Sequence, residues 1–357
     1  CKRVFKYASL AVFYWCSSPT PKEFAMRKQT KALLLFIFFT LNFPAMAGTA
    51  YRISGPYTEK NLSIYLVHGK NQNTKDKFLT LGEAMEKNKV RVHETGNVNR
   101  LQIENISKKD NVYIQAGDII KGGKQDRVFS TDMILEPQSG KVAISAFCVE
   151  KGRWSKRGKE SLSRFQSSKK QLVSKKLRLA TRLNKNQSEV WKEVSKVQAA
   201  ISSNVGKKIN DARSNSSLQL ALENKSLDVM VKRYKKKLMP VIKHKKDVIG
   251  YAFSINGKLN TADIYANNQL FVKLWPKLLD AAATEAISEY KKTLKYSIPG
   301  KADINTWFSN ANKGKVTKTK LNEKIGSTKT ENESDVQFST YSSDSKKTFY
   351  HKQLLRK

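Results

Sequence analysis

The stretch VIGYAFSINGKLNTADIYA, residues 248–266, carries the strongest short-range structural signal in the chain. Two runs of apolar and β-branched residues flank Asn256-Gly257. Asn-Gly is the preferred dipeptide of two-residue hairpin loops, because both of its residues accept a positive φ. We therefore predict a β-hairpin over residues 247–265.

Helical periodicity surrounds this hairpin on both sides. Apolar residues recur at helical spacing in residues 186–201 and in 227–238, where Pro240 ends the second helix. A longer pattern runs from about 267 to 292, and Pro276 should kink or split it. Residues 159–185 are rich in Lys, Ser and Arg and are expected to form a connecting stretch with a solvated face.

Nearer the N-terminus the pattern changes to that of strands. Runs with a period of two recur about every ten residues, at 63–68, 90–93, 101–104, 112–114 and 142–149. Thr80 to Glu83 forms a capping-box pattern that opens a short helix. The spacing of the runs favours an antiparallel sandwich or a small barrel.

These patterns predict an α+β fold in a single domain over residues 51–300. An antiparallel β-sandwich-like N-terminal half, residues 51–155, packs against a helical half, residues 156–300, that contains the one hairpin. Residues 301–357 are polar and rich in Lys, Ser, Thr and Asn, and we expect a basic, largely disordered tail.

The N-terminus carries an export signal. From Met26, a basic segment precedes an apolar run over residues 32–43, and Ala45-Met46-Ala47 has the small-x-small form of a Sec cleavage site. We predict that residues 1–25 come from upstream translation and that a signal peptide, residues 26–47, is removed after Ala47. The mature chain would be periplasmic or secreted, with no transmembrane segment.

The charge balance indicates an affinity for anions. The chain has 67 Lys and Arg against 30 Asp and Glu, a formal net charge of +37. A surface of this kind attracts nucleic acid, anionic lipid or acidic polysaccharide, so weak surface binding to polyanions is one prediction. The excess lysines are spread along the whole chain, which is also typical of an ordinary solvated surface.

Several common kinds of site have no counterpart in the sequence. The four histidines are scattered without metal-ligand spacing, and we predict no metal site. Walker A, nucleophile-elbow and dinucleotide-binding glycine motifs are all missing, and no particular cofactor is indicated. Cys148 is the single cysteine after Ala47, and it lies in an apolar strand, where a buried inert thiol is favoured over a nucleophile.

The clearest candidate site is the stretch GDIIKGGKQDR at residues 117–127. Its glycine pair lets backbone N–H groups approach an oxyanion closely, and Lys124, Gln125 and Arg127 can bind an anionic ligand. Asp126, together with Asp132 further on, can act as a catalytic base or orient the arginine. The alternative is an ordinary glycine turn with charged flanks.

A second charged block follows the last strand of this half. Glu150, Arg153 and Trp154 belong to the stretch EKGRW and are further candidates for ligand binding. An arginine beside a tryptophan can form a stacking platform. It can equally form a structural corner in which Trp154 covers the end of the sandwich.

Together, the stretches GDIIKGGKQDRVFSTDMILEPQSG and AFCVEKGRW resemble the signature of the ARG and rhodanese-phosphatase-superfamily-associated protein domain family. The later stretches SEVWKEV, GYAFSINGKLNTADIYA and LFVKLWPKLL resemble its downstream half, so the resemblance spans roughly residues 57–290. It implies a link to ADP-ribose or phosphorylated-nucleotide chemistry through the proteins with which the family is associated. It also strengthens the case for the first block, and it adds Asp263 and Trp275 as residues that could face the same cleft.

Three hypotheses follow. The first is an anion-recognising domain, an enzyme in one version, with Arg127 and Lys124 clamping a phosphorylated or nucleotide-like ligand. The second is a non-enzymatic exported module that holds a polyanion or a protein on its lysine-rich surface. The third is a scaffold without a small-molecule site. The residues alone leave the ligand's identity open.

Overall fold

The computed structural model describes residues 51–72, 77–343 and 348–357. These residues belong to one compact unit, Thr49–Lys357. The predicted upstream segment and the predicted signal peptide lie outside the described residues.

The predicted hairpin is confirmed, and it lies in the middle of the largest sheet. β12 (Val248–Ile255) and β13 (Lys258–Tyr265) pair in antiparallel fashion. Asn256 and Gly257 have φ angles of 51° and 73°, the left-handed conformations that this kind of turn requires. β12 also pairs with β2 (Leu62–His68), so the hairpin joins the N-terminal region to the rest of the sheet.

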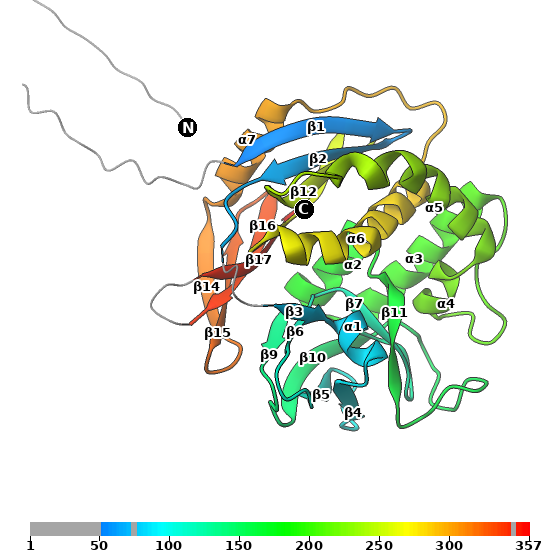
Figure 1. Ribbon diagram of the computed structural model, residues 1–357. Helices are drawn as coiled ribbons and strands as arrows, with labels where there is room; N and C mark the ends of the chain where they lie inside the picture. The colour runs from blue at the N-terminus through cyan, green and yellow to red at the C-terminus, as the bar shows by residue number, and fades with distance from the viewer. Residues whose placement is uncertain (1–50, 73–76, 344–347) are drawn as a thin grey trace, which may run out of the picture. The chain divides into compact units, whose positions relative to one another are not determined.

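The sheet has eight strands in the order β1-β2-β12-β13-β17-β16-β15-β14 (Figure 1). Its other strands are β1 (Arg52–Glu59), β14 (Lys315–Lys320), β15 (Ile325–Glu331), β16 (Asp335–Ser342) and β17 (Phe349–Arg356). All neighbouring pairs are antiparallel. Strands from three distant parts of the chain therefore build one sheet.

The C-terminal strands correct the expectation that residues 301–357 form a largely disordered tail. This segment forms α7 (Lys301–Ala311) and four strands of the large sheet. A polar composition suggested disorder because few apolar side chains were available for burial. Pairing of β17 with β13 and the burial of Val336 and Leu355 provide the stability that composition did not reveal.

Helices cover both faces of the large sheet (Figure 1). One face is packed by α3 (Gln187–Val205), α5 (Lys225–Leu238) and α6 (Asn268–Ser288). Ile64 faces this helical layer, whereas its neighbour Tyr65 faces α7 on the opposite side. Because successive side chains of a strand alternate between faces and both faces are covered, every residue of β2 and β12 is buried. No helix in the described part of the chain is long and apolar enough to cross a membrane.

Two predictions for the helical region need adjustment. α6 runs unbroken through Pro276, so the helix is not split there. The stretch 159–185, expected to be a connection, contains β11 (Phe165–Gln171), α2 (Lys175–Leu179) and a π-helical turn (Ala180–Asn184). The remaining short helices are α4 (Leu218–Leu222) and the 3-10 turn Met239–Ile242.

Two smaller sheets, built from the N-terminal half and from β11, confirm the α+β class. The six-stranded sheet has the order β11-β7-β8-β10-β5-β4, and the three-stranded sheet has the order β3-β6-β9. Their strands are β3 (Phe78–Thr80), β4 (Val90–Glu94), β5 (Arg100–Asn105), β6 (Asn111–Ile114), β7 (Asp118–Gly122), β8 (Arg127–Phe129), β9 (Met133–Leu135) and β10 (Val142–Cys148). Ile103, Ile114 and Phe129 belong to one apolar core that both sheets share.

α1 (Leu81–Glu86) begins at the predicted capping box. The Thr80 hydroxyl accepts a hydrogen bond from the Glu83 N–H at 3.3 Å, and the Thr80 N–H donates to the Glu83 carboxylate at 2.8 Å. These two bonds satisfy backbone donors at the start of the helix. They also fix Glu83 at the edge of the cleft described below.

Candidate functional site

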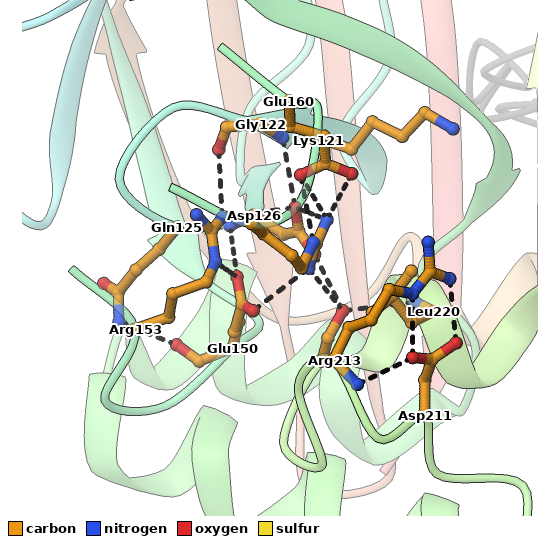
Figure 2. A network of polar contacts seen from close by, with 12 residues as sticks. Lys121, Gly122, Gln125, Asp126, Glu150, Arg153, Glu160, Asp211, Arg213 and Leu220 are labelled. Atoms are coloured by element: carbon orange, nitrogen blue, oxygen red, sulfur yellow. Dashed lines mark hydrogen bonds and ion pairs between the residues drawn. The ribbon is translucent and has the colours of Figure 1, made fainter. Parts of the chain in front are cut away.

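The first predicted block forms the turn between β7 and β8, and its Asp126 is fully buried. The Asp126 carboxylate accepts hydrogen bonds from both terminal nitrogens of Arg157, at 2.8 and 2.9 Å, and from the Ser217 hydroxyl at 2.7 Å. Its Oδ1 also accepts a hydrogen bond from the Gly122 N–H at 3.2 Å. Figure 2 shows Asp126 at the centre of these contacts.

The second predicted block completes the same cluster. Glu150 accepts hydrogen bonds from Arg153 Nε at 2.8 Å and from Arg157 at 3.0 Å. Arg153 also donates to the Gly122 carbonyl at 3.2 Å (Figure 2) and to the Gly123 carbonyl at 3.1 Å. The buried arginine network consists of Asp126, Glu150, Arg153 and Arg157.

Burial controls the protonation behaviour of the network. It raises the pKa of Asp126 above its ordinary value, despite the opposing hydrogen bonds from Arg157. Burial also acts to raise the pKa of Glu150. In that case hydrogen bonds from Ser214, the Asp126 N–H and Arg153 outweigh burial and hold the pKa below its ordinary value. The carboxylates and guanidinium groups of the network bind one another, so the network is suited to holding the loops that carry them together.

The remaining residues of the first block are divided between interior and surface. Gln125 is buried and donates to the Glu150 carbonyl at 3.0 Å, whereas the Lys124 side chain is exposed. Arg127 is buried, 3.5 Å from Glu94, and it contacts the sulfur of Cys148. The joint anion clamp by Lys124 and Arg127 stays a prediction, and its two side chains differ in access to solvent.

The thiol of Cys148 is buried beside Arg127. Burial raises the pKa of the thiol to about 11. A thiol with a raised pKa carries little thiolate near neutral pH, and the thiolate is the nucleophilic form. The environment of Cys148 is therefore typical of an inert structural cysteine.

Asp132 lies in a second buried cluster, apart from Asp126. Its carboxylate accepts hydrogen bonds from Arg182 at 3.0 Å and from Thr340 at 3.0 Å, and it lies 3.1 Å from His351 Nδ1. His351 Nε2 lies 3.0 Å from Asp263, so the imidazole bridges two carboxylates. Asp126 and Asp132 are thus not neighbours in one catalytic centre.

The two carboxylates determine the charge of His351. Burial acts to lower the pKa of the imidazole, but Asp132 and Asp263 outweigh it and raise this pKa to about 9. His351 lies on β17, within the segment expected to be disordered. Trp275, expected to share a cleft with Asp263, is buried and donates its indole N–H to the Met239 carbonyl at 3.2 Å.

A further group of charged side chains lines a cleft of about 690 Å³. Its walls come from α1, β11, α5 and α6, together with the first residue of β7, Asp118. We call it the lysine cleft, after the five lysines that line it: Lys169, Lys170, Lys235, Lys273 and Lys277. Asp118 belongs to the first family-like stretch, and Lys273 and Lys277 belong to LFVKLWPKLL. The cleft therefore brings together parts of the sequence that resembled the family.

Four of the five cleft lysines, all except Lys169, contact carboxylates. Lys277 donates to Asp118 at 2.7 Å, and Lys273 donates to Glu83 at 3.1 Å. Asp280 is shared, because Lys170 lies at 3.0 Å and Lys235 at 3.4 Å from its carboxylate. The Lys235 side chain is 30% exposed, compared with 2% for Arg157 in the buried arginine network.

The carboxylate of Glu83 is held ionised at the rim of the cleft. Partial burial acts to raise its pKa, but the hydrogen bond from the Thr80 N–H and the charge of Lys273 lower it below the ordinary value. The cleft therefore presents ammonium groups and carboxylates in alternation. Such a lining can contact a ligand's anionic groups and its hydroxyl or amino groups at the same time.

No sequence signal singled out the residues of the lysine cleft. Lys170, Lys235 and Asp280 are separated by long stretches of chain, and lysine is abundant everywhere. Arg157 was also missed, since it follows the recognised EKGRW stretch inside a lysine-rich loop. In the described part of the chain, no group of His, Cys, Asp and Glu side chains is arranged to hold a metal ion.

A family model described as the ARG and Rhodanese-Phosphatase-superfamily-associated Protein domain matches residues 50–355. This match includes all five family-like stretches and the C-terminal strands β14 to β17, except for Arg356. No curated protein and no solved structure matches the chain.

Proposed function

The chain belongs to the ARG and Rhodanese-Phosphatase-superfamily-associated Protein domain family, and from this premise we propose that it is an anion-recognising protein. Its ligand carries a phosphate group and several hydroxyl groups, as sugar phosphates and nucleotides do. The ligand binds in the lysine cleft between α1, β11, α5 and α6. The observation that carries this proposal is the convergence of five lysines on one cleft of about 690 Å³.

Spare hydrogen-bond donors on the lysines support binding of a phosphate. An ammonium group has three N–H donors. Lys235 uses one of them for Asp280, and Lys277 uses one for Asp118. The other donors are available to phosphate oxygens without rupture of the existing ion pairs. The carboxylates keep the ammonium groups in place before the ligand arrives, which lowers the entropic cost of binding.

The carboxylates of the cleft favour a ligand with hydroxyl groups. Asp280 and Asp228 lie beside Lys170, and each ionised carboxylate offers about four acceptor sites. A bare phosphate would meet repulsion from these groups, whereas a sugar phosphate offers hydroxyl donors to them. The volume of the cleft lies within the range of roughly 300–1,000 Å³ found for small-molecule sites.

The proposal is tested by calorimetric titration of the chain from Gly48 onward with ADP-ribose, nucleotides, sugar phosphates and inorganic phosphate. We expect at least one phosphorylated sugar or nucleotide to bind more tightly than inorganic phosphate. Lys235→Met and Lys273→Met should each weaken that binding about tenfold. Neither change leaves a carboxylate without a partner, because Asp280 still pairs with Lys170 and Glu83 still accepts a hydrogen bond from the Thr80 N–H.

Lys292→Met is the matched control, since this lysine is exposed and does not line the cleft. It should leave the affinity unchanged. Equal effects of Lys292→Met and Lys235→Met would mean that the anion binds to the general basic surface, and would overturn the cleft as the site. A pocket-bound ligand should also tolerate moderate salt.

Surface binding of a polyanion is a second candidate function. α5 exposes Lys225, Lys232, Arg233, Lys236 and Lys237. Cations repeated along one helix can contact successive phosphates or carboxylates of a polymer. For this function the logarithm of the binding constant should fall linearly and steeply with the logarithm of the salt concentration, which separates it from binding in the cleft.

A further inference from the structure

In the loop of residues 151–164, charged side chains are buried and large apolar side chains are exposed, which is the reverse of the usual distribution. It connects β10 to β11 without a helix or strand of its own. The buried residues in it are Arg153 and Arg157, both in the buried arginine network. In contrast, Trp154 is 54% exposed and Leu162 is 44% exposed. We call this segment the anchored loop.

Both ends of the anchored loop are fixed to the same glycine turn. Arg153 donates to the carbonyls of Gly122 and Gly123, at 3.2 and 3.1 Å. The Gly123 N–H donates to the Ser161 carbonyl at 3.0 Å. Trp154 follows Arg153, and Leu162 follows Ser161, so the two exposed apolar residues flank one turn. The loop therefore presents them from a rigid base.

The surface around this turn is strongly basic. Besides Lys151, which lies over the Trp191 ring, the exposed cations are Lys124, Lys156, Lys159 and Arg164. None of them forms an ion pair with a carboxylate of the described residues. Glu160, the acidic residue of the loop, is already bound by Arg157 at 2.9 Å. The loop thus combines free positive charge with two apolar side chains.

We propose that the anchored loop docks the protein on an anionic lipid bilayer. Trp154 and Leu162 enter the interfacial layer, and the four cations contact lipid phosphates. Tryptophan is enriched at membrane interfaces because its ring is largely apolar and carries one N–H donor. Apolar insertion and attraction to anionic lipid together give stable but reversible binding, which either contribution alone gives only weakly.

The exposure of Leu162 favours a bilayer over a soluble polymer. Lysines and a stacking tryptophan would suffice to bind a nucleic acid or an acidic polysaccharide. An exposed leucine gains nothing from either polymer, whereas in a bilayer it leaves water altogether. Because the loop is fixed by buried arginines, little conformational entropy is lost when it docks. This surface is separate from the lysine cleft and does not depend on the function proposed there.

The experiment is co-sedimentation of the chain from Gly48 onward with vesicles that contain phosphatidylglycerol, compared with vesicles of phosphatidylcholine alone. We expect binding to the anionic vesicles, weakened by high salt. Trp154→Ser combined with Leu162→Ser should lower the partition coefficient by about tenfold or more. Lys124→Gln combined with Lys156→Gln and Lys159→Gln should lower it and also reduce its dependence on salt.

Val229→Ser is the control, because Val229 is 53% exposed on α5, outside the loop. It should bind vesicles like the unchanged protein. The proposal is overturned if the Trp154 and Leu162 variant binds anionic vesicles as well as the Val229 variant does. It is equally overturned if an oligonucleotide or heparin binds in a Trp154-dependent manner while vesicles do not. Should the double variant fail to give the native thermal transition, the lysine variant answers the same question.

Discussion

The buried arginine network and the lysine cleft are built from the same kinds of charge, yet they differ in how completely those charges are used. In the network, Asp126 accepts four hydrogen bonds, and its side chain has no exposed area. In the cleft, Lys235 makes one contact of 3.4 Å and is 30% exposed. The first arrangement has no capacity left for another partner, whereas the second has spare donors and access to solvent.

The choice of cation explains part of this difference. The planar guanidinium of Arg157 binds Asp126 with two parallel bonds and reaches Glu150 as well. Such fork-shaped contacts suit a permanent buried pair. The ammonium group of a lysine is a compact charge on a flexible stem, so it can turn from a protein carboxylate toward a ligand phosphate. A charged cluster is therefore a candidate ligand site when its donors are incompletely used.

Removal of Arg157 should have the largest effect on stability. Arg157→Met leaves Asp126 and Glu150 buried with too few partners, and we expect a loss of about 3–5 kcal/mol in the free energy of unfolding. Urea denaturation measures this loss. Arg213→Met is the matched control, because Arg213 pairs with Asp211 but is 61% exposed, and its loss should stay below about 1 kcal/mol. Similar losses for both arginines would remove the distinction between buried and exposed pairs.

The cluster around His351 should make the stability of the protein depend on pH above neutrality. The folded pKa of His351 is raised to about 9 from the ordinary 6.5, so its stabilising contribution is fully present below pH 6.5. That contribution is lost as the pH rises through 9, and we expect a decrease of about 3 kcal/mol. The groups that face the imidazole are Asp132, Asp263, the stacked ring of Tyr265 and, edge-on, the ring of Tyr113.

The measurement is the free energy of unfolding at several pH values between 6 and 10. His351→Asn should lower stability below pH 6.5 and flatten the curve between 6.5 and 9. A curve that keeps its slope in the variant would show that another group causes the pH dependence.

Loss of a cleft lysine should have the smallest effect on stability. Lys235→Met removes one ion pair of 3.4 Å made by a side chain that is 30% exposed, while Asp280 still pairs with Lys170 at 3.0 Å. We expect a change of less than about 1 kcal/mol in the absence of ligand, measured by the same denaturation. A loss comparable to that of Arg157→Met would mean that the cleft lysines are structural, and it would count against their role in binding.

Local sequence signals were sufficient for much of the fold. The hairpin at Asn256-Gly257, the capping box at Thr80 and the helical stripes of α3 and α5 were predicted correctly, because each depends on neighbouring residues. The strands β15 to β17 were missed. In β16 the buried positions include Thr340 and Ser342 besides Val336, so the strand shows no apolar alternation. Its stability comes from partners far away in the sequence, such as Asp132 for Thr340.

The candidate site was harder to predict than the fold. Residue types identified Asp126, Glu150 and Arg153 as unusual, and the structure brings all three together. Their burial could not be inferred, because it depends on Arg157 and Ser217, which no recognised stretch contained. The lysine cleft could not be predicted at all from one sequence, since its lysines differ from the other lysines only in position.

The order of the strands has a consequence for how the molecule is made. β17 lies between β13 and β16, yet it is the last strand in the sequence. While the chain is being synthesised, the edge of β13 stays open, and the sheet cannot close until β17 has emerged from the ribosome.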